Sequence, residues 1–361
     1  MSEEINEEVI ENTENGEPKS LAPDFKRACL RIGAMMIVVF AVRCVSTILL
    51  SLTKPLYNDW SSVAKQLLEM VASIVFLNVI PITAGIFILK FPLKSGVKAM
   101  YSKPRYFGRA LGIFPAGYGL AMAVGIITVL VGMLFKNTSI EESFNVTRNI
   151  VIVPDMQSAI VWFVHAVVVA PLFEEFWFRG MVLQTLKPYG NGFAIFVSGI
   201  LFGLTHANLQ QFFFTSVIGI VLGYVAVQTG SIITTTVIHA MFNSIAATSS
   251  LFLANSSVQD YILEIARGNN PEKSPVVVVY LIWNTAVILF AVVGFFMAIY
   301  KLAHIRRYRV PKVQTEMSTG KRWGIFLLCP TVIVMLLLAF DTMTFRFITQ
   351  KIIDLIVDIF Y

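Results

Sequence analysis

The sequence predicts an all-α fold: a polytopic membrane bundle of about eight or nine transmembrane helices with a C-terminal amphipathic helix. Of its 361 residues, 56% are hydrophobic and only 14% are charged, whereas soluble globular domains contain about 25% charged residues. The mean hydropathy is +0.73. Several apolar stretches reach about 20 residues, the length of helix that crosses the hydrocarbon core of a bilayer. These observations place the chain among multi-pass membrane proteins.

The chain begins with an acidic segment, which we assign to residues 1–25. Eight of the 22 acidic residues of the chain lie among the first 24 positions. Such a segment buries too little apolar surface to fold, so we expect a disordered tail. It also lacks the positively charged start of a signal peptide.

Nine apolar stretches follow the tail. We expect membrane helices near 30–52, 65–90, 108–135, 157–187, 192–206, 211–228, 232–254, 275–301 and 323–340. Polar residues recur at helical spacing opposite isoleucines over 345–361, which predicts an amphipathic helix at the membrane interface or a terminal packing helix. The expected organisation is N-terminal membrane helices over 26–154, a central segment over 155–255, and C-terminal membrane helices with the amphipathic helix over 256–361.

The basic residues predict the orientation of the chain in the membrane. They gather before the first stretch (Lys26, Arg27, Arg31), between the second and third (Lys90, Lys94, Lys98, Lys103, Arg105, Arg109) and between the eighth and ninth (Lys301, Arg306, Arg307, Arg309, Lys312, Lys321, Arg322). An alternating path through the membrane puts all three groups on one side. Because cytoplasmic loops favour lysine and arginine, we expect a cell-membrane protein with a cytoplasmic N-terminus.

Two adjacent glutamates, Glu174 and Glu175, lie well inside an apolar stretch. Carboxylates at membrane depth are costly, and a functional role is the first hypothesis for them. The structural alternative is a salt bridge within the helix bundle. Glu175 and Arg179 are four residues apart and can pair on one helix face. Glu174 lies about 140° from Arg179 around the helix, so we expect it to stay unpaired and to act as a general base.

Two of the four histidines accompany other notable side chains at helical spacing. Phe202 and His206 lie four residues apart, as do His239 and Asn243. In an antiparallel hairpin that turns near 187–191, Glu174 and His206 fall at nearly the same depth, while the match for His239 is only approximate. Small-residue seams at Gly199-xxx-Gly203 and Gly219-xxx-Gly223 permit close helix contact.

A glutamate, two histidines and an asparagine inside a membrane cavity suit hydrolysis. Glu174 would deprotonate a water that His206 orients, directly or through a metal, while His239 and Asn243 donate hydrogen bonds to the developing oxyanion. A zinc alternative uses the histidines with a carboxylate, the candidate ligands being Glu175, His206 and His239. The compact HExxH signature is missing, so the sequence is compatible with zinc but does not require it.

Three motifs in this order carry a resemblance to a known family. EEFWFR (174–179) fits EExxxR, FGLTH (202–206) fits FxxxH and HAMFN (239–243) fits HxxxN. Over roughly 155–255 the chain resembles the CPBP, or Abi, family of intramembrane proteases, which includes type II CAAX prenyl endopeptidases and bacteriocin-processing or immunity proteins. The resemblance implies a membrane-embedded peptidase, commonly labelled a metalloprotease. The implied roles are catalytic base (Glu174), partner carboxylate (Glu175), structural support (Arg179), water or metal binding (His206), and oxyanion or metal binding (His239, Asn243).

The expected function is therefore intramembrane endopeptidase, a hydrolase. The expected partners are a peptide or membrane-protein substrate and the lipid bilayer, with no nucleic acid. Two other classes stay open: a non-catalytic membrane scaffold or regulator that keeps the motif residues as polar contacts, and an ion-coupled transporter that uses Glu174 and His206 as a relay. The transporter is disfavoured because few other polar residues would line a continuous path.

Overall fold

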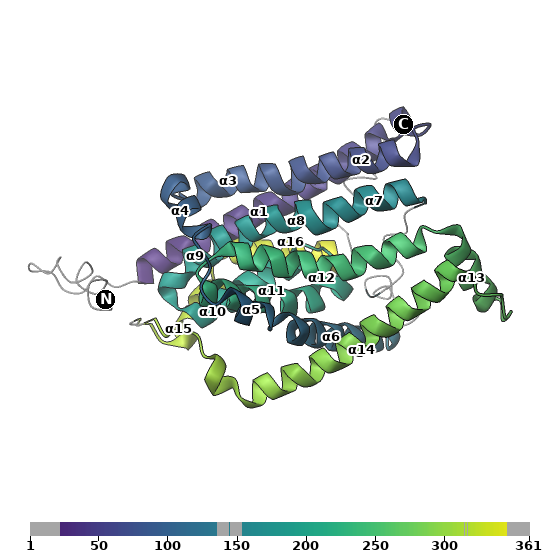
Figure 1. Cartoon of the computed structure of the whole chain (residues 1–361). Helices are drawn as coiled ribbons and strands as arrows, with labels where there is room; N and C mark the ends of the chain where they lie inside the picture. The colour runs from purple at the N-terminus through teal and green to yellow at the C-terminus, as the bar shows by residue number, and fades with distance from the viewer. Residues whose placement is uncertain (1–21, 136–143, 145–153, 314, 316, 345–361) are drawn as a thin grey trace, which may run out of the picture.

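The computed structural model describes residues 22–135, 144, 154–313, 315 and 317–344, and the described part contains helices and no strand (Figure 1). The predicted all-α membrane fold is confirmed. The first helix already begins at Ala22, inside the segment assigned to the acidic tail. The rest of that tail and the amphipathic helix expected at 345–361 lie outside the described residues.

The helices follow the predicted apolar stretches closely. Their bounds are α1 Ala22–Thr53, α2 Ser62–Ala72, α3 Ile80–Leu89, α4 Leu93–Met100, α5 Phe107–Leu111, α6 Phe114–Met133, α7 Met156–Val164, α8 Ala170–Glu175, α9 Leu183–Leu186, α10 Asn191–Leu204, α11 Leu209–Thr229, α12 Ile232–Leu253, α13 Ser256–Ala266, α14 Pro275–Ala303, α15 Thr319–Leu327 and α16 Pro330–Thr344. π-Helical turns join α2 to α3 (Ser73–Val79), α7 to α8 (His165–Val169) and α8 to α9 (Phe176–Val182).

Among the described residues, seven helical spans are long and apolar enough to cross a membrane, or eight if α15 and α16 count as one. Two predicted spans differ from expectation. The one at 192–206 is α10, whose 14 residues fall short of the roughly 17 needed to cross the bilayer. The one at 323–340 is broken by a 66° bend, because Pro330 lacks an N–H and disfavours a helical residue before it.

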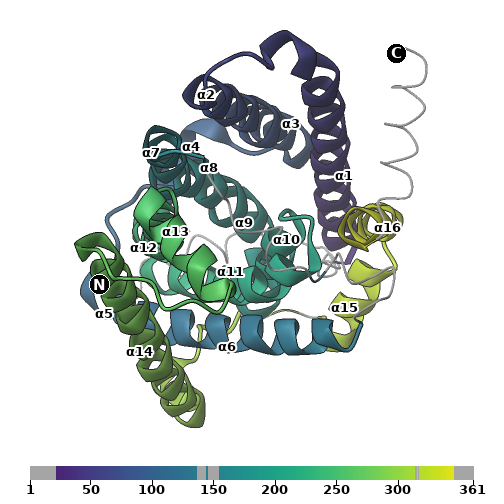
Figure 2. The same cartoon turned by 90° about the vertical axis from the view of Figure 1, so that its right-hand side faces the viewer.

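Helices α10 and α11 form the centre of the bundle (Figure 2). Their two predicted glycine seams face each other: a Cβ on Gly219 would lie 2.8 Å from the Gly199 Cα atom. Side chains at these positions would hold the backbones apart, so the glycines allow the close packing. One apolar core lies between α10 and the helices α1, α3 and α9, and a second joins α11 to α6 and α12.

Helix α14 lies on the outside of this arrangement, along the lower edge of the bundle in Figure 1. Only 6% of its most apolar 18-residue window is buried, and its exposed residues are large and apolar, for example Ile282, Ile288 and Phe296. An apolar surface of this size is stable against lipid tails rather than water. The chain is therefore a multi-pass membrane protein.

The three basic groups meet at one end of the bundle, as the alternating path predicts. The backbone N–H of Arg105 donates to Thr229 O (2.9 Å), and Gln228 Nε2 in the same turn donates to Arg309 O (3.2 Å). Asn191 Nδ2 donates to Pro311 O (2.8 Å), and the neighbouring Tyr189 ring lies 4.8 Å from that of Phe25, beside the first basic group. The cytoplasmic orientation of this end stays a prediction.

The glycine seam yields a matched pair of substitutions. In Gly199→Ala the new Cβ would lie 2.6 Å from the Ile220 backbone N, and overpacking of this kind costs about 1–3 kcal/mol. In Gly223→Ala it would lie 3.4 Å from Ile195, an ordinary contact, and alanine favours a helix by up to about 1 kcal/mol. Thermal unfolding in detergent should show a lower Tm for Gly199→Ala only. Equal Tm values would contradict this account of the seam.

Candidate active site

The span that carries the two glutamates is held at its start by a helix cap. At its start, the Asp155 carboxylate caps α7 by accepting from the Ser158 backbone N–H (2.8 Å) and also accepts from the Ser62 hydroxyl of α2. The bond from the Ser158 N–H is the main cause that holds the pKa of Asp155 below its usual value. The cap fixes where α7 begins and attaches it to α2.

Asn243 compensates for a backbone donor that Pro171 lacks. In the π-helical turn the N–H of Ala170 donates to His165 O, five residues back. By the same register a residue at 171 would donate to Ala166 O, but proline has no N–H. Asn243 Nδ2 on α12 donates to this Ala166 oxygen at 2.7 Å. The motif asparagine therefore ties α12 to the glutamate-bearing helix, about two turns before the carboxylates.

Glu175 and Arg179 form the predicted ion pair, and both side chains are completely buried. Arg179 Nη1 lies 2.8 Å from Glu175 Oε1, and Nη2 donates to Gly219 O on α11 (3.0 Å). The guanidinium also stacks on the Phe202 ring, 4.6 Å from its centroid, a favourable cation–π geometry. The pair thus joins its own helix to α10 and α11.

His239 is the histidine that contacts both carboxylates. Its Nδ1 lies 2.9 Å from Glu175 Oε1 and its Nε2 lies 3.7 Å from Glu174 Oε2. A carboxylate oxygen cannot donate, so Nδ1 carries the proton of the shorter contact and Nε2 faces Glu174. Counting residues along the helices predicted that His206 lies at the depth of Glu174, whereas the predicted depth of His239 agreed only approximately. The structure differs because the π turns change both the rise and the phase of the helix.

His206 lies in the turn just after α10. Its Nδ1 donates to Phe202 O at 3.1 Å, which leaves Nε2 as the acceptor of a neutral ring. The Phe202 ring packs edge-on against both histidines, with centroids 5.2 Å from His206 and 5.5 Å from His239. Phe202, buried at 2% exposure, thus lies between the two imidazoles and packs against both; its structural support of the site, which the sequence also suggests, stays a prediction.

Arg43 on α1 is a site residue that the sequence analysis missed. Its Nη1 donates to Thr205 O at 2.5 Å, beside His206. From the other side, Asn208 Nδ2 donates to His206 O (3.1 Å). The available signal was an arginine inside the first apolar stretch, which a search restricted to acids and histidines passes over. Helix α1, outside the motif region, therefore helps to hold the His206 turn.

The two glutamates differ in access. The Glu175 side chain is 0% exposed, and Oε1 already accepts from Arg179 and His239. The Glu174 side chain is 27% exposed and lies against a His239 side chain that is 4% exposed. The 3.7 Å between Glu174 Oε2 and His239 Nε2 is too long for a direct hydrogen bond, so His239 does not occupy the Glu174 carboxylate. Glu174 is therefore the carboxylate that can reach a substrate or a water.

The candidate metal ligands do not form a ready site. Within the described ranges, no group of three or more His, Cys, Asp or Glu side chains is close enough to hold a metal ion. The Glu175 oxygen nearest to His239 already has its two partners. The Nδ1–H groups of His206 and His239 are both bound to oxygens, a pattern that would suit Nε2 ligation, but the third ligand is not in place.

Comparison with known proteins adds one finding. Residues 156–245 match the family model described as type II CAAX prenyl endopeptidase Rce1-like. No curated protein and no solved structure matches the chain. The matched segment contains Glu174, Glu175, His206, His239 and Asn243 but neither α1 nor α14. Over this segment the chain is similar to the type II CAAX prenyl endopeptidase family, in line with the resemblance that the three motifs carry.

Proposed function

We propose that the protein is an intramembrane endopeptidase in which Glu174 activates a water to hydrolyse peptide bonds of membrane-associated peptides or proteins. The observation that carries the proposal is the position of His239 between two unequal carboxylates. Glu175 is sealed by Arg179, while Glu174 is partly exposed at the other ring nitrogen. A structural polar contact would not need the second, open carboxylate.

The reaction begins with a water between Glu174 and the histidines. Glu174 accepts a proton from this water. His206 Nε2 accepts a hydrogen bond from the other hydrogen of the water and so orients the nucleophile. Phe202 and the Arg43-bound turn hold His206 in place. Holding Glu174, His206 and the water in place before the substrate arrives lowers the entropic part of the activation barrier.

The hydroxide then attacks the peptide carbonyl, and its oxygen becomes negative. Asn243 has two Nδ2 hydrogens, of which one is donated to Ala166 O, and the second serves the oxyanion. When the C–N bond breaks, Glu174 returns its proton to the leaving amine.

The substrate reaches this site from the bilayer or from its interface. The chain is multi-pass, and the site residues lie on helices of the membrane bundle. The matched family is described by its prenyl endopeptidases, so a peptide with a prenylated C-terminus is the first substrate class to test, beside the same peptide without the lipid.

Glu174→Gln tests the proposed function directly. Glutamine has the same shape but cannot accept the proton. We therefore expect cleavage to fall by about 10²–10⁴-fold, measured on whichever of the prenylated and unprenylated peptides the unchanged protein cleaves faster. The Tm should stay close to that of the unchanged protein, because the Arg179 pair is intact. Glu69→Gln, which removes an exposed carboxylate on α2, is the matched control. Cleavage by Glu174→Gln at the rate of the control would rule out Glu174 as the general base and with it the proposed mechanism.

Asn243→Ala separates an oxyanion role from a structural one. We expect a lower Tm, because Ala166 O loses its donor, and also a fall in kcat of about 10²-fold from the lost oxyanion contact. Asn284→Ala on α14 removes a similar bond, Nδ2 to Tyr280 O (2.8 Å), outside the site and should leave kcat unchanged. A lower Tm with normal kcat would limit Asn243 to its structural bond.

Chelator treatment tests the absence of a ready three-ligand site in the described part of the chain. We expect peptide cleavage to persist in excess chelator, with no stoichiometric zinc in the purified protein by elemental analysis. Loss of cleavage that added zinc restores would show that the ligands assemble around a metal and would contradict the metal-free route.

A further inference from the structure

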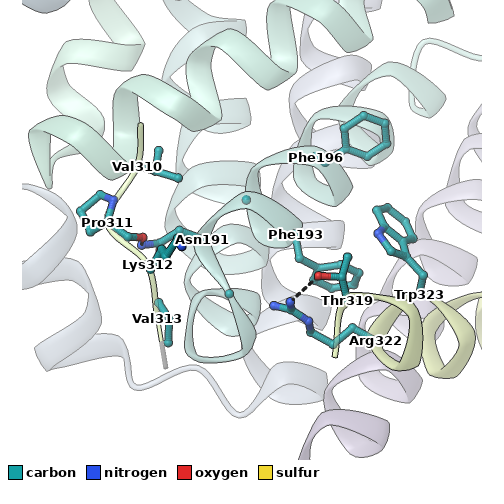
Figure 3. Close-up of a pocket in the computed structure, with 12 residues that line it drawn as sticks. Asn191, Phe193, Phe196, Val310, Pro311, Lys312, Val313, Thr319, Arg322 and Trp323 are labelled. Atoms are coloured by element: carbon teal, nitrogen blue, oxygen red, sulfur yellow. Dashed lines mark hydrogen bonds between the residues drawn. The ribbon is translucent and has the colours of Figure 1, made fainter. Parts of the chain in front are cut away.

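A second candidate site lies at the basic end of the bundle, away from the glutamates. A cavity of about 630 Å³ opens between the start of α10, the segment after α14 and the start of α15. Asn191 and Lys312 line one side, and Arg322 and Trp323 lie on the other (Figure 3). Neither the peptidase chemistry nor the family motifs use these residues.

Arg322 is held in the cavity by backbone and hydroxyl oxygens. Its Nη1 donates to Tyr189 O (2.5 Å) and its Nη2 donates to Thr319 Oγ1 (3.0 Å). No acidic side chain among the described residues pairs with it. Gly190 has φ +130°, and a Cβ there would collide with Arg322 Nη1. The glycine therefore lets the guanidinium approach the start of α10, and the exposed Lys312 adds a second positive charge.

The start of α10 supplies donors to the same cavity. The helix begins at Asn191 without a side-chain cap, since its N-cap residue is Gly190, so its first N–H groups point out of the helix end. A Cβ on Gly192, which lines the cavity, would meet no atom within 4 Å. Uncapped N–H groups and the positive end of the helix dipole favour an anion such as phosphate.

The Asn191 side chain offers the cavity a hydrogen-bond acceptor, for which a simple anion has no donor. Its side chain is 7% exposed, Nδ2 donates to Pro311 O, and Oδ1 is buried with no hydrogen-bond partner in the described part of the chain. A buried acceptor of this kind needs a hydrogen-bond donor, and a ligand in the cavity is one source of it. The cavity therefore fits a ligand that carries both a phosphate and a hydroxyl or ammonium group.

We propose that this cavity binds the headgroup of a glycerophospholipid such as phosphatidylglycerol or phosphatidylethanolamine. The phosphate contacts Arg322, Lys312 and the start of α10, and the headgroup donor contacts Asn191 Oδ1. The acyl chains leave along Phe196, which is 45% exposed and packs edge-on against Trp323 at 5.6 Å. A basic cavity with an aromatic exit, at the end of a membrane bundle, is where lipid headgroups lie.

Thermal unfolding of the delipidated full-length protein in detergent tests this site. We expect short-chain phosphatidylglycerol to raise the Tm saturably. Gly192→Asp puts a negative charge in the cavity without a clash and favours the helix start, so the protein should fold but bind at least about tenfold more weakly, the loss of one charge-assisted bond. Gly192→Asn, the neutral counterpart, should bind like the unchanged protein.

Two further comparisons test which phosphate-containing ligand binds and which basic side chain holds it. Arg322→Gln should weaken binding, and Lys321→Gln, which removes a neighbouring charge outside the cavity, should not. Inorganic phosphate should give little stabilisation, and phosphatidylcholine, which has no headgroup donor, should bind more weakly. Equal stabilisation by inorganic phosphate or phosphatidylcholine, equal binding by Gly192→Asp, or no saturable rise in Tm would each overturn the proposal.

Discussion

The buried ion pair between Glu175 and Arg179 is the interaction on which the rest of the site depends. Two completely buried charges at 2.8 Å stabilise the fold only if their remaining hydrogen-bonding groups are satisfied. Gly219 O accepts from Arg179 Nη2, His239 Nδ1 donates to the same Glu175 oxygen that meets Arg179, and the Phe202 ring covers the guanidinium. Among the described residues, Glu175 Oε2 and Arg179 Nε have no hydrogen-bond partner, so the pair depends on these few contacts. Helices α10, α11 and α12 must therefore take fixed positions around the glutamate-bearing helix.

These positions assign different roles to two chemically identical neighbours. Because His239 Nδ1 is bound to Glu175, its Nε2 faces Glu174. The His206 imidazole is oriented in a similar way, by the Phe202 ring and by the Arg43 contact to the turn that contains it. Removing Arg179 would leave Glu175 as an uncompensated buried charge, at a cost of about 3–5 kcal/mol. The structural carboxylate is thus the reason that the open carboxylate can be positioned.

Helix α10 connects the two ends of the molecule. It carries the His206 turn at its end and borders the basic cavity at its start. Its 14 residues are too few to cross the bilayer alone, but the glycine seam lets it pack closely on α11. A short central helix surrounded by longer ones can place one end at the interface and the other inside the membrane.

By itself, the sequence determined the class of protein and the contacts within each helix. Composition and apolar length are sufficient for an all-α membrane bundle, and the four-residue spacing of Glu175 with Arg179 and of Phe202 with His206 sets neighbours by helix geometry alone. The tertiary structure decided which histidine meets which carboxylate, that Asn243 donates to Ala166 O, and that Arg43 reaches the His206 turn. These contacts join different helices, and π turns, a proline and glycine-controlled packing change helix phase and crossing in ways that residue counting along one helix does not contain.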